Sequence, residues 1–146
     1  MSSIVEILPN LWIGHYHECG NLLSFNECNI DTVINGCGMV PFTIGKITKY
    51  DISISPDDNI PDMIHKMNGV LECIHLRLSK NKFILMYSHK GDQVDSTIIL
   101  CYLMKYGKMD PKNAIQAISS KRTNEFQYGL LFKRFLFTFY ETIQSV

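Results

Sequence analysis

The chain lacks an excess of charge of either sign. Its 14 basic residues balance 14 acidic residues, so net charge gives no reason to expect nucleic acid or an anionic membrane as a partner. No apolar run approaches the roughly 20 residues that cross a bilayer, and the N-terminus lacks the basic region and long apolar core of a signal peptide. We therefore expect an intracellular, cytoplasmic protein, with a nuclear location left open, that binds neither nucleic acid nor membrane.

Paired cysteine motifs are also missing. The five cysteines are odd in number, widely spaced and without a CxxC pair: Cys19, Cys28, Cys37, Cys73 and Cys101. This usage favours free thiols in a reducing compartment over a disulfide framework. Neither these residues nor the five histidines have the spacing of a zinc site. We expect no metal and no cofactor.

What the chain does contain is the composition of an ordinary globular domain. Hydrophobic residues make up 46% and charged residues 19% of the 146 residues, which argues against disorder. This length suits one domain, and we expect residues 1–146 to form it. Repeats and low-complexity segments are absent.

Strand patterns alternate with helix patterns along the chain. Short apolar runs predict strands over residues 4–7, 11–14, 32–35, 50–54 and 83–87, the first two separated by the Pro9-Asn10 turn. Residues 22–25 suggest a short helical stretch. Gly36-Cys37-Gly38 suggests a loop in which glycines take positive φ.

Longer helices follow from apolar spacing and from capping signals. Residues 55–62 form a loop that leads through Pro61 into an amphipathic helix extending to about Leu78. Further helices are expected over residues 96–106, ending at Gly107, from Asp110-Pro111 onward, and over residues 125–143. This order predicts an α/β fold with a mainly parallel central sheet and helices on both faces.

The segment Phe83 to Met104 is the most informative part of the sequence. A buried strand, a polar turn from Ser88 to Asp95 and an apolar helix succeed one another. Such a layout is a natural anion cradle, because the amides at a helix N-terminus point at the ligand.

This layout resembles the dual-specificity protein phosphatases, whose signature H-C-x5-R-[S/T] lies between a strand and a helix. The opening Ile7-x-Pro9-x-Leu11-Trp12-Ile13-Gly14 also resembles that family. With the family's Gly on Gly91 and its Tyr-Leu-Met on residues 102–104, the signature disagrees at four positions. Tyr87 replaces His, Ser88 the Cys nucleophile, Val94 the Arg, and Asp95 the hydroxyl residue. The resemblance implies a catalytically dead member, a pseudophosphatase.

The exchanged residues remove the chemistry of that family. A cysteine thiolate can attack phosphorus near neutral pH, whereas a serine hydroxyl stays protonated without a base. His89 follows Ser88, but sequence neighbours on an extended loop usually point apart, so we expect His89 to face solvent. Val94 cannot supply the bidentate fork of an arginine. An engineered Cys-to-Ser change would not explain the other three differences.

The loop is also acidic. We assign residues 87–95 to a degenerate phosphate loop: Tyr87, Ser88, His89, Lys90, Gly91, Asp92, Gln93, Val94 and Asp95. One lysine faces two aspartates within it, and a phosphate dianion near a carboxylate is repelled by several kcal/mol at an effective dielectric of about 20. Phosphate binding should therefore be weak or absent.

Asp95 and two positions outside the loop have expected roles. Asp95 is expected at the helix N-cap, either filling part of the space of a bound phosphate or simply facing solvent. Asp57, with Asp58 as the neighbouring alternative, matches the family's general acid, although an Asp in such a loop is more often a turn former or a helix cap. Asn35 matches an Asn that holds the phosphate loop in the family.

The leading hypothesis is a protein-binding pseudophosphatase that acts as a scaffold, a competitor or an assembly component. Its partner would be a protein, such as a phosphoprotein or a component of a kinase pathway. The alternatives are a hydrolase with altered chemistry at Ser88, His89 or Asp92, a reader of phosphorylated ligands, which the acidic loop argues against, and a structural homodimer or larger homo-oligomer. For the last, the aromatic tail 130–143 is the candidate surface, although packing into the core is the more usual fate of such a tail.

Overall fold

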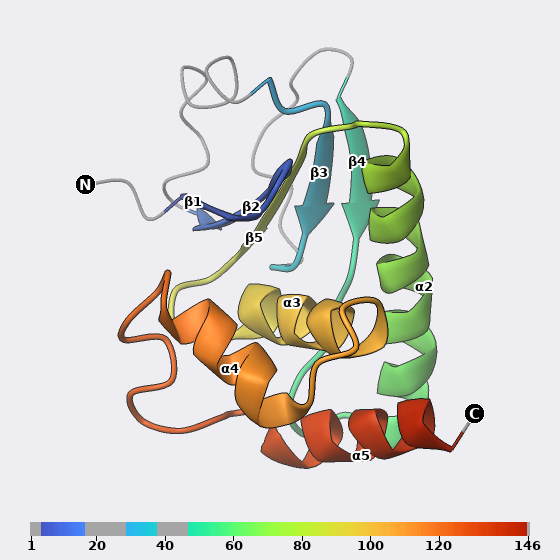
Figure 1. Ribbon diagram of the computed structural model, residues 1–146, viewed down its shortest axis with the longest axis vertical. Helices are drawn as coiled ribbons and strands as arrows, with labels where there is room; N and C mark the ends of the chain where they lie inside the picture. The colour runs from blue at the N-terminus through green and yellow to red at the C-terminus, as the bar shows by residue number, and fades with distance from the viewer. Residues whose placement is uncertain (1–3, 17–28, 38–46, 146) are drawn as a thin grey trace.

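The computed structural model describes residues 4–16, 29–37 and 47–145, which combine a central sheet with helices (Figure 1). The elements, in chain order, are β1 (Val5–Leu8), β2 (Leu11–His15), β3 (Thr32–Asn35), β4 (Thr48–Asp51), α2 (Ile60–Ser79), β5 (Ile84–Ser88), α3 (Val94–Lys105), α4 (Pro111–Ser119) and α5 (Lys133–Gln144). The predicted helical stretch at residues 22–25 lies outside the described residues.

The five strands form one sheet in the order β1-β2-β5-β3-β4. The β2–β5, β5–β3 and β3–β4 pairs are parallel, and only β1–β2 is antiparallel. The prediction of a mainly parallel sheet is therefore confirmed. β5 occupies the centre, with Leu85 opposite both Trp12 and Val33, so the segment that follows β5 emerges at the middle of the sheet edge.

The two faces of the sheet carry different apolar clusters. The larger cluster joins strand residues such as Ile13, Ile34 and Met86 to the buried sides of α2, α3, α4 and α5. The smaller cluster, around Val33 and Tyr87 on the opposite face, contains no residue of a described helix. The expected helical cover is thus confirmed for one face, and on the other face none of the described helices packs.

Helix α2 follows the predicted pattern closely. The Asn59 side chain caps it by accepting the Asp62 amide at 3.2 Å, and Pro61 stands in the first turn, where a missing N–H costs nothing. Its apolar stripe packs into the larger cluster: Met63, Met67, Val70, Leu71 and Ile74. None of the described helices is long and apolar enough to span a membrane.

Two predicted boundaries were wrong by three residues or more. The period-two pattern at residues 50–54 does give alternating burial, but β4 pairs only from Thr48 to Asp51, and the later residues lead away from the sheet toward α2. The last helix begins at Lys133 instead of near Glu125, because residues 123–128 form turns. In the second case the Gln93 side chain holds the carbonyls of Glu125 and Gly129, a contact between distant parts of the chain that no local pattern indicates.

The role of Gly36 also differs from the prediction. It does not adopt positive φ; instead the backbone passes so close to the loop that a Cβ would lie 3.0 Å from the Tyr87 carbonyl oxygen and 3.0 Å from Val94 Cγ1. The glycine is therefore required for close packing of β3 against the start of α3. Its amide also donates to the Tyr87 carbonyl at 2.8 Å.

Replacing Gly36 by alanine should lower the free energy of unfolding by about 1–3 kcal/mol, since backbone or Val94 must shift to admit the methyl group. Gly69→Ala is the matched control, because Gly69 lies exposed in the middle of α2 with nothing within 4 Å of the added Cβ. That change should stabilise by about 0.5–1 kcal/mol through helix propensity. Urea unfolding measures both; equal effects would contradict the close approach at Gly36.

Candidate functional site

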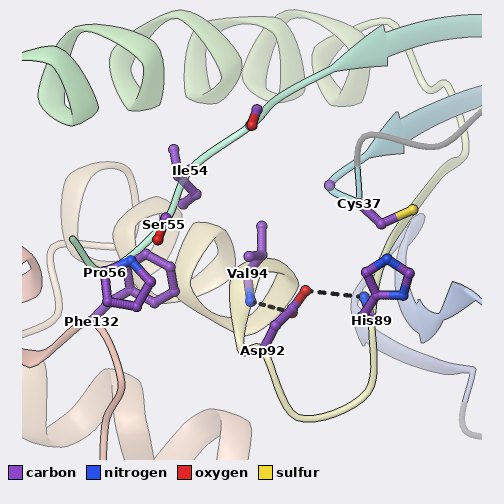
Figure 2. A pocket seen from close by; sticks show the side chains of 10 residues that line it. Cys37, Ile54, Ser55, Pro56, His89, Asp92, Val94 and Phe132 are labelled. Atoms are coloured by element: carbon purple, nitrogen blue, oxygen red, sulfur yellow. Dashed lines mark hydrogen bonds between the residues drawn. The ribbon is translucent and has the colours of Figure 1, made fainter. Parts of the chain in front are cut away.

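The candidate site is the loop that joins the central strand β5 to α3. Loops at the carboxyl ends of parallel strands are the usual place for ligands in open α/β sheets. The loop lies beside a pocket of about 270 Å³. This pocket is lined by Gly36, Cys37, Ser53, Ile54, Ser55, Pro56, His89, Asp92, Val94 and Phe132 (Figure 2).

Asp92 closes this loop with its own carboxylate. Its Oδ2 accepts the His89 amide at 3.2 Å and its Oδ1 accepts the Val94 amide at 3.0 Å, as the dashed lines in Figure 2 show. Gln93, in the left-handed region at φ 58°, turns the chain so that this is possible. Two amides of the cradle are therefore already occupied by an anion that belongs to the chain.

The first amides of α3 are also satisfied from within the chain. The Asp95 amide donates to Ser88 Oγ at 3.3 Å, the Ser96 amide to Asp95 Oδ1 at 2.7 Å, and the Thr97 amide to the Gln93 carbonyl at 2.9 Å. Val94, Asp95 and Ser96 are the first three residues of the helix, whose N–H groups have no partner in the helix backbone, and the Thr97 amide makes the first bond within the helix. The amides of residues 94–97 are thus all paired within the chain before any anion binds.

The expected position of Asp95 was wrong. The helix starts at Val94, two residues before the predicted Ser96, so Asp95 stands inside the first turn and its side chain is buried. Its carboxylate does not face solvent, and the carboxylate that accepts the loop amides of His89 and Val94 is that of Asp92. Asp95 Oδ2 instead lies 3.1 Å from Arg122 Nη1, and the same nitrogen donates to Glu125 Oε2 at 2.6 Å.

This buried cluster of Asp95, Arg122 and Glu125 raises the pKa of Asp95. Burial disfavours the carboxylate, and Arg122 only partly offsets it while Glu125 adds to it, so the pKa rises from its ordinary 3.8 to about 6. Two further Arg122 nitrogens, Nε and Nη2, are buried without a hydrogen-bond partner. The cluster therefore holds the loop in place, although its ion pairs only partly offset the cost of burying the three charges.

Gln93 joins the loop to the segment before α5. Its Nε2 donates to the carbonyls of Glu125, at 3.1 Å, and Gly129, at 2.9 Å, while its Oε1 accepts the Leu131 amide at 2.9 Å. Sequence reasoning assigned Gln93 only as a loop residue and missed Arg122 and Glu125. A buried Asp needs a cationic partner, so a buried Asp95 would have predicted a nearby Arg or Lys. The sequence does not indicate which of these residues it is.

The remaining predicted residues are dispersed around the loop. Ser88 is buried and lines none of the described pockets. His89 is exposed as expected, with its ring centroid 5.7 Å from that of Tyr16. Tyr87 is buried in the smaller apolar cluster, and Lys90 and Gly91 line a different hollow from the one that contains Asp92. Val94 is buried in the larger apolar cluster.

The residues assigned outside the loop lie farther from its centre. Asp57 is exposed and lines an adjoining hollow, and Asp58 closes a turn by accepting the Ser55 amide at 2.9 Å. Asn35 is buried, donates to Asp51 Oδ1 at 2.9 Å and accepts the Cys37 amide at 3.1 Å. Among the described residues no group of His, Cys, Asp or Glu side chains could hold a metal ion.

The buried Asp95 should leave a signature in stability against pH. Because its folded pKa lies above its unfolded one, the folded state binds more protons between about pH 4 and 6, so stability falls as pH rises through that window. We compare the free energy of unfolding of the wild type with that of Asp95→Asn. The difference, wild type minus variant, should fall by about 3 kcal/mol between pH 4 and pH 7. Urea titrations measure it; a difference that rises with pH would contradict the assignment.

No protein-family model matches the chain. Curated proteins are similar to it in sequence, among them two phosphatases. The MAP kinase phosphatase with leucine-rich repeats protein 3 of Dictyostelium discoideum is 26% identical over 121 residues, and the tyrosine-protein phosphatase yvh1 of Schizosaccharomyces pombe is 25% identical over 126. The matches cover 80% and 84% of the chain, but only 14% and 37% of the relatives. The chain thus spans well under half the length of these relatives.

Solved structures show the same arrangement of elements. Human DUSP28 superposes with a TM-score of 0.83 at 16% identity, covering 99% of the chain and 97% of that structure. The human tyrosine phosphatase-like serine/threonine/tyrosine-interacting protein gives 0.83 at 20% identity, with both chains fully covered. A leucine-rich repeat and phosphatase domain protein of Entamoeba histolytica gives 0.79 at 14%, covering 98% and 94%. The chain has the single-domain fold of the dual-specificity phosphatases.

Proposed function

We propose that this protein is a pseudophosphatase, which binds another protein and hydrolyses no phosphate. The observation that carries the proposal is the occupation of the loop amides: Asp92 accepts those of His89 and Val94, and Ser88 accepts that of Asp95. A phosphate needs these donors free. Here they are paired before any ligand arrives.

The residue at the position of the nucleophile is also unsuited to attack. Ser88 is fully buried, and its Oγ accepts a backbone amide. A serine needs a base that takes its proton, whereas the neighbouring His89 is exposed and packs beside Tyr16. The alternative of a hydrolase with altered chemistry required an open Ser88 beside a base, so this arrangement gives it no support.

Electrostatics opposes the phosphate as well. Val94 is apolar and 4% exposed, so no arginine fork is available at that position to neutralise the ligand. The Asp92 carboxylate accepts two of the loop amides that a bound anion would use, and a pair of like unit charges about 4 Å apart costs about 4 kcal/mol at an effective dielectric of 20. The same repulsion argues against a reader of phosphorylated ligands.

A protein that keeps the phosphatase fold but lacks the catalytic residues can still bind another protein. The human neighbour of 20% identity bears the name of a phosphatase-like, interacting protein, which supports the analogy. Exposed apolar side chains near the loop offer contact area, with Tyr128 93% and Leu131 49% exposed. A scaffold, a competitor of an active phosphatase or an assembly component would each use such a surface.

A structural homo-oligomer is less well supported. The aromatic tail that suggested it packs mostly inside the protein, because Phe135, Leu136 and Phe139 are buried in the larger cluster. Phe137 is 43% exposed, which leaves little apolar surface on α5 for a second copy.

Restoring catalysis should require removal of Asp92. The variant Tyr87→His, Ser88→Cys, Val94→Arg, Asp95→Ser rebuilds the signature, yet it should stay inactive on p-nitrophenyl phosphate because Asp92 still covers the amides. Adding Asp92→Ala should raise the rate at least about 100-fold, the usual scale for restored anion stabilisation. Initial rates of p-nitrophenol release measure both variants.

The controls separate the proposal from its alternatives. Asp92→Ala alone should remain inactive, since Ser88 and Val94 are unchanged. Wild-type turnover that disappears in Ser88→Ala would refute the pseudophosphatase. Equal activity of the variants with and without Asp92→Ala would show that Asp92 does not block the loop.

A further inference from the structure

The pocket beside the loop is shaped for one side chain. Its volume of about 270 Å³ lies below the roughly 300–1,000 Å³ of pockets that hold drug-sized ligands. Among its described lining residues the only one charged at neutral pH is Asp92, with His89 counted as neutral. The pocket therefore presents a single carboxylate where the fold would otherwise hold an anion.

The carboxylate keeps capacity for a ligand. Each of its oxygens accepts one amide, from His89 or from Val94, and a carboxylate oxygen has two lone pairs. Asp92 is also half-buried, so it is reachable from the pocket. Two adjacent oxygens, each with a lone pair left, match the paired N–H groups of a guanidinium.

The walls suit the aliphatic part of such a side chain. Ile54, Val94 and Phe132 are at most 8% exposed and line the pocket together with Pro56 (Figure 2). Arginine and lysine bury their methylene groups along apolar surface while their charged ends reach polar partners. An apolar wall with one acidic end is complementary to that shape.

The surrounding charges favour a cation overall. An adjoining hollow shares Pro56 and Phe132 with the pocket and adds Asp57, Asp58 and Arg134. Lys66 lies near as well, since its Nζ donates to the Ser53 carbonyl at 3.0 Å. With Asp92 these make three acids and two bases, and Lys90 of the loop lines a different hollow. The pocket itself therefore presents a carboxylate and none of these bases.

We propose that this pocket binds an arginine side chain of the protein partner, with the guanidinium on Asp92 and the methylenes against Val94 and Phe132. The inference rests on the proposed function, because it names the chemistry by which the inactive loop recognises a protein. The site would then bind a cation, whereas a phosphate-binding loop on the same fold binds an anion.

Nuclear magnetic resonance of the ¹⁵N-labelled full chain tests the proposal with four probes: butylguanidinium, butylammonium, 1-butanol and phenyl phosphate. Butylguanidinium should shift the amide signals of His89 and Val94 saturably, in the millimolar range, and 1-butanol and phenyl phosphate should not. Butylammonium should bind more weakly, since it lacks the fork. Raising the salt from about 0.02 M to about 0.3 M should weaken the guanidinium interaction.

Two variants locate the effect. Asp92→Asn keeps an acceptor oxygen but removes the charge, and should weaken butylguanidinium binding about tenfold. Glu72→Gln, the matched control, removes a carboxylate from the exposed side of α2 outside the pocket and should leave binding unchanged. The salt dependence of the wild type serves as the second readout if Asp92→Asn disturbs the loop.

The outcomes are distinct. Equal affinity of Asp92→Asn and wild type without salt dependence, equal binding of 1-butanol, or tighter binding of butylammonium would overturn the arginine site and leave the proposed function standing. Release of phenol from phenyl phosphate, lost in Ser88→Ala, would overturn the proposed function itself.

Discussion

The structure around the site depends on one constraint: the backbone amides at the start of α3 must have acceptors. A buried N–H without a partner costs about as much as a lost hydrogen bond. In an anion-binding loop the ligand supplies the acceptors, and here the chain does, through Asp92, Ser88 and Asp95. This internal satisfaction decides where the helix begins, why the loop is stable without a ligand, and why a carboxylate faces the pocket.

The same loop is fixed from outside by the segment that precedes α5. Arg122 reaches Asp95, and Gln93 holds the carbonyls of Glu125 and Gly129. Phe132, which ends that segment, forms a wall of the pocket. Loop and wall are consequently positioned by one set of polar contacts, so the pocket has a defined shape although residues 123–128 form turns.

Local patterns in the sequence were sufficient for most of the fold. The period of the strands, the apolar stripe of α2 and the cap of α4, where Asp110 accepts the Asn113 amide at 2.8 Å, are encoded by neighbouring residues. The site was predicted as a degenerate loop, but its closing residue was misassigned to Asp95. Whether Asp92 or Asp95 turns inward depends on Arg122, 27 positions beyond Asp95, and no local pattern carries contacts of that range.

The close approach of Gly36 to Val94 and the contact of Arg122 with Asp95 bear on how such a loop can change over generations. A side chain at position 36 would meet Val94, so the residues at positions 36 and 94 do not vary independently. A small residue at position 95 alone would leave Arg122 with Glu125 as its one acidic contact in the cluster. Substitutions at positions 36, 94, 95 and 122 are therefore energetically coupled, and the effect of one depends on which residue its neighbour carries.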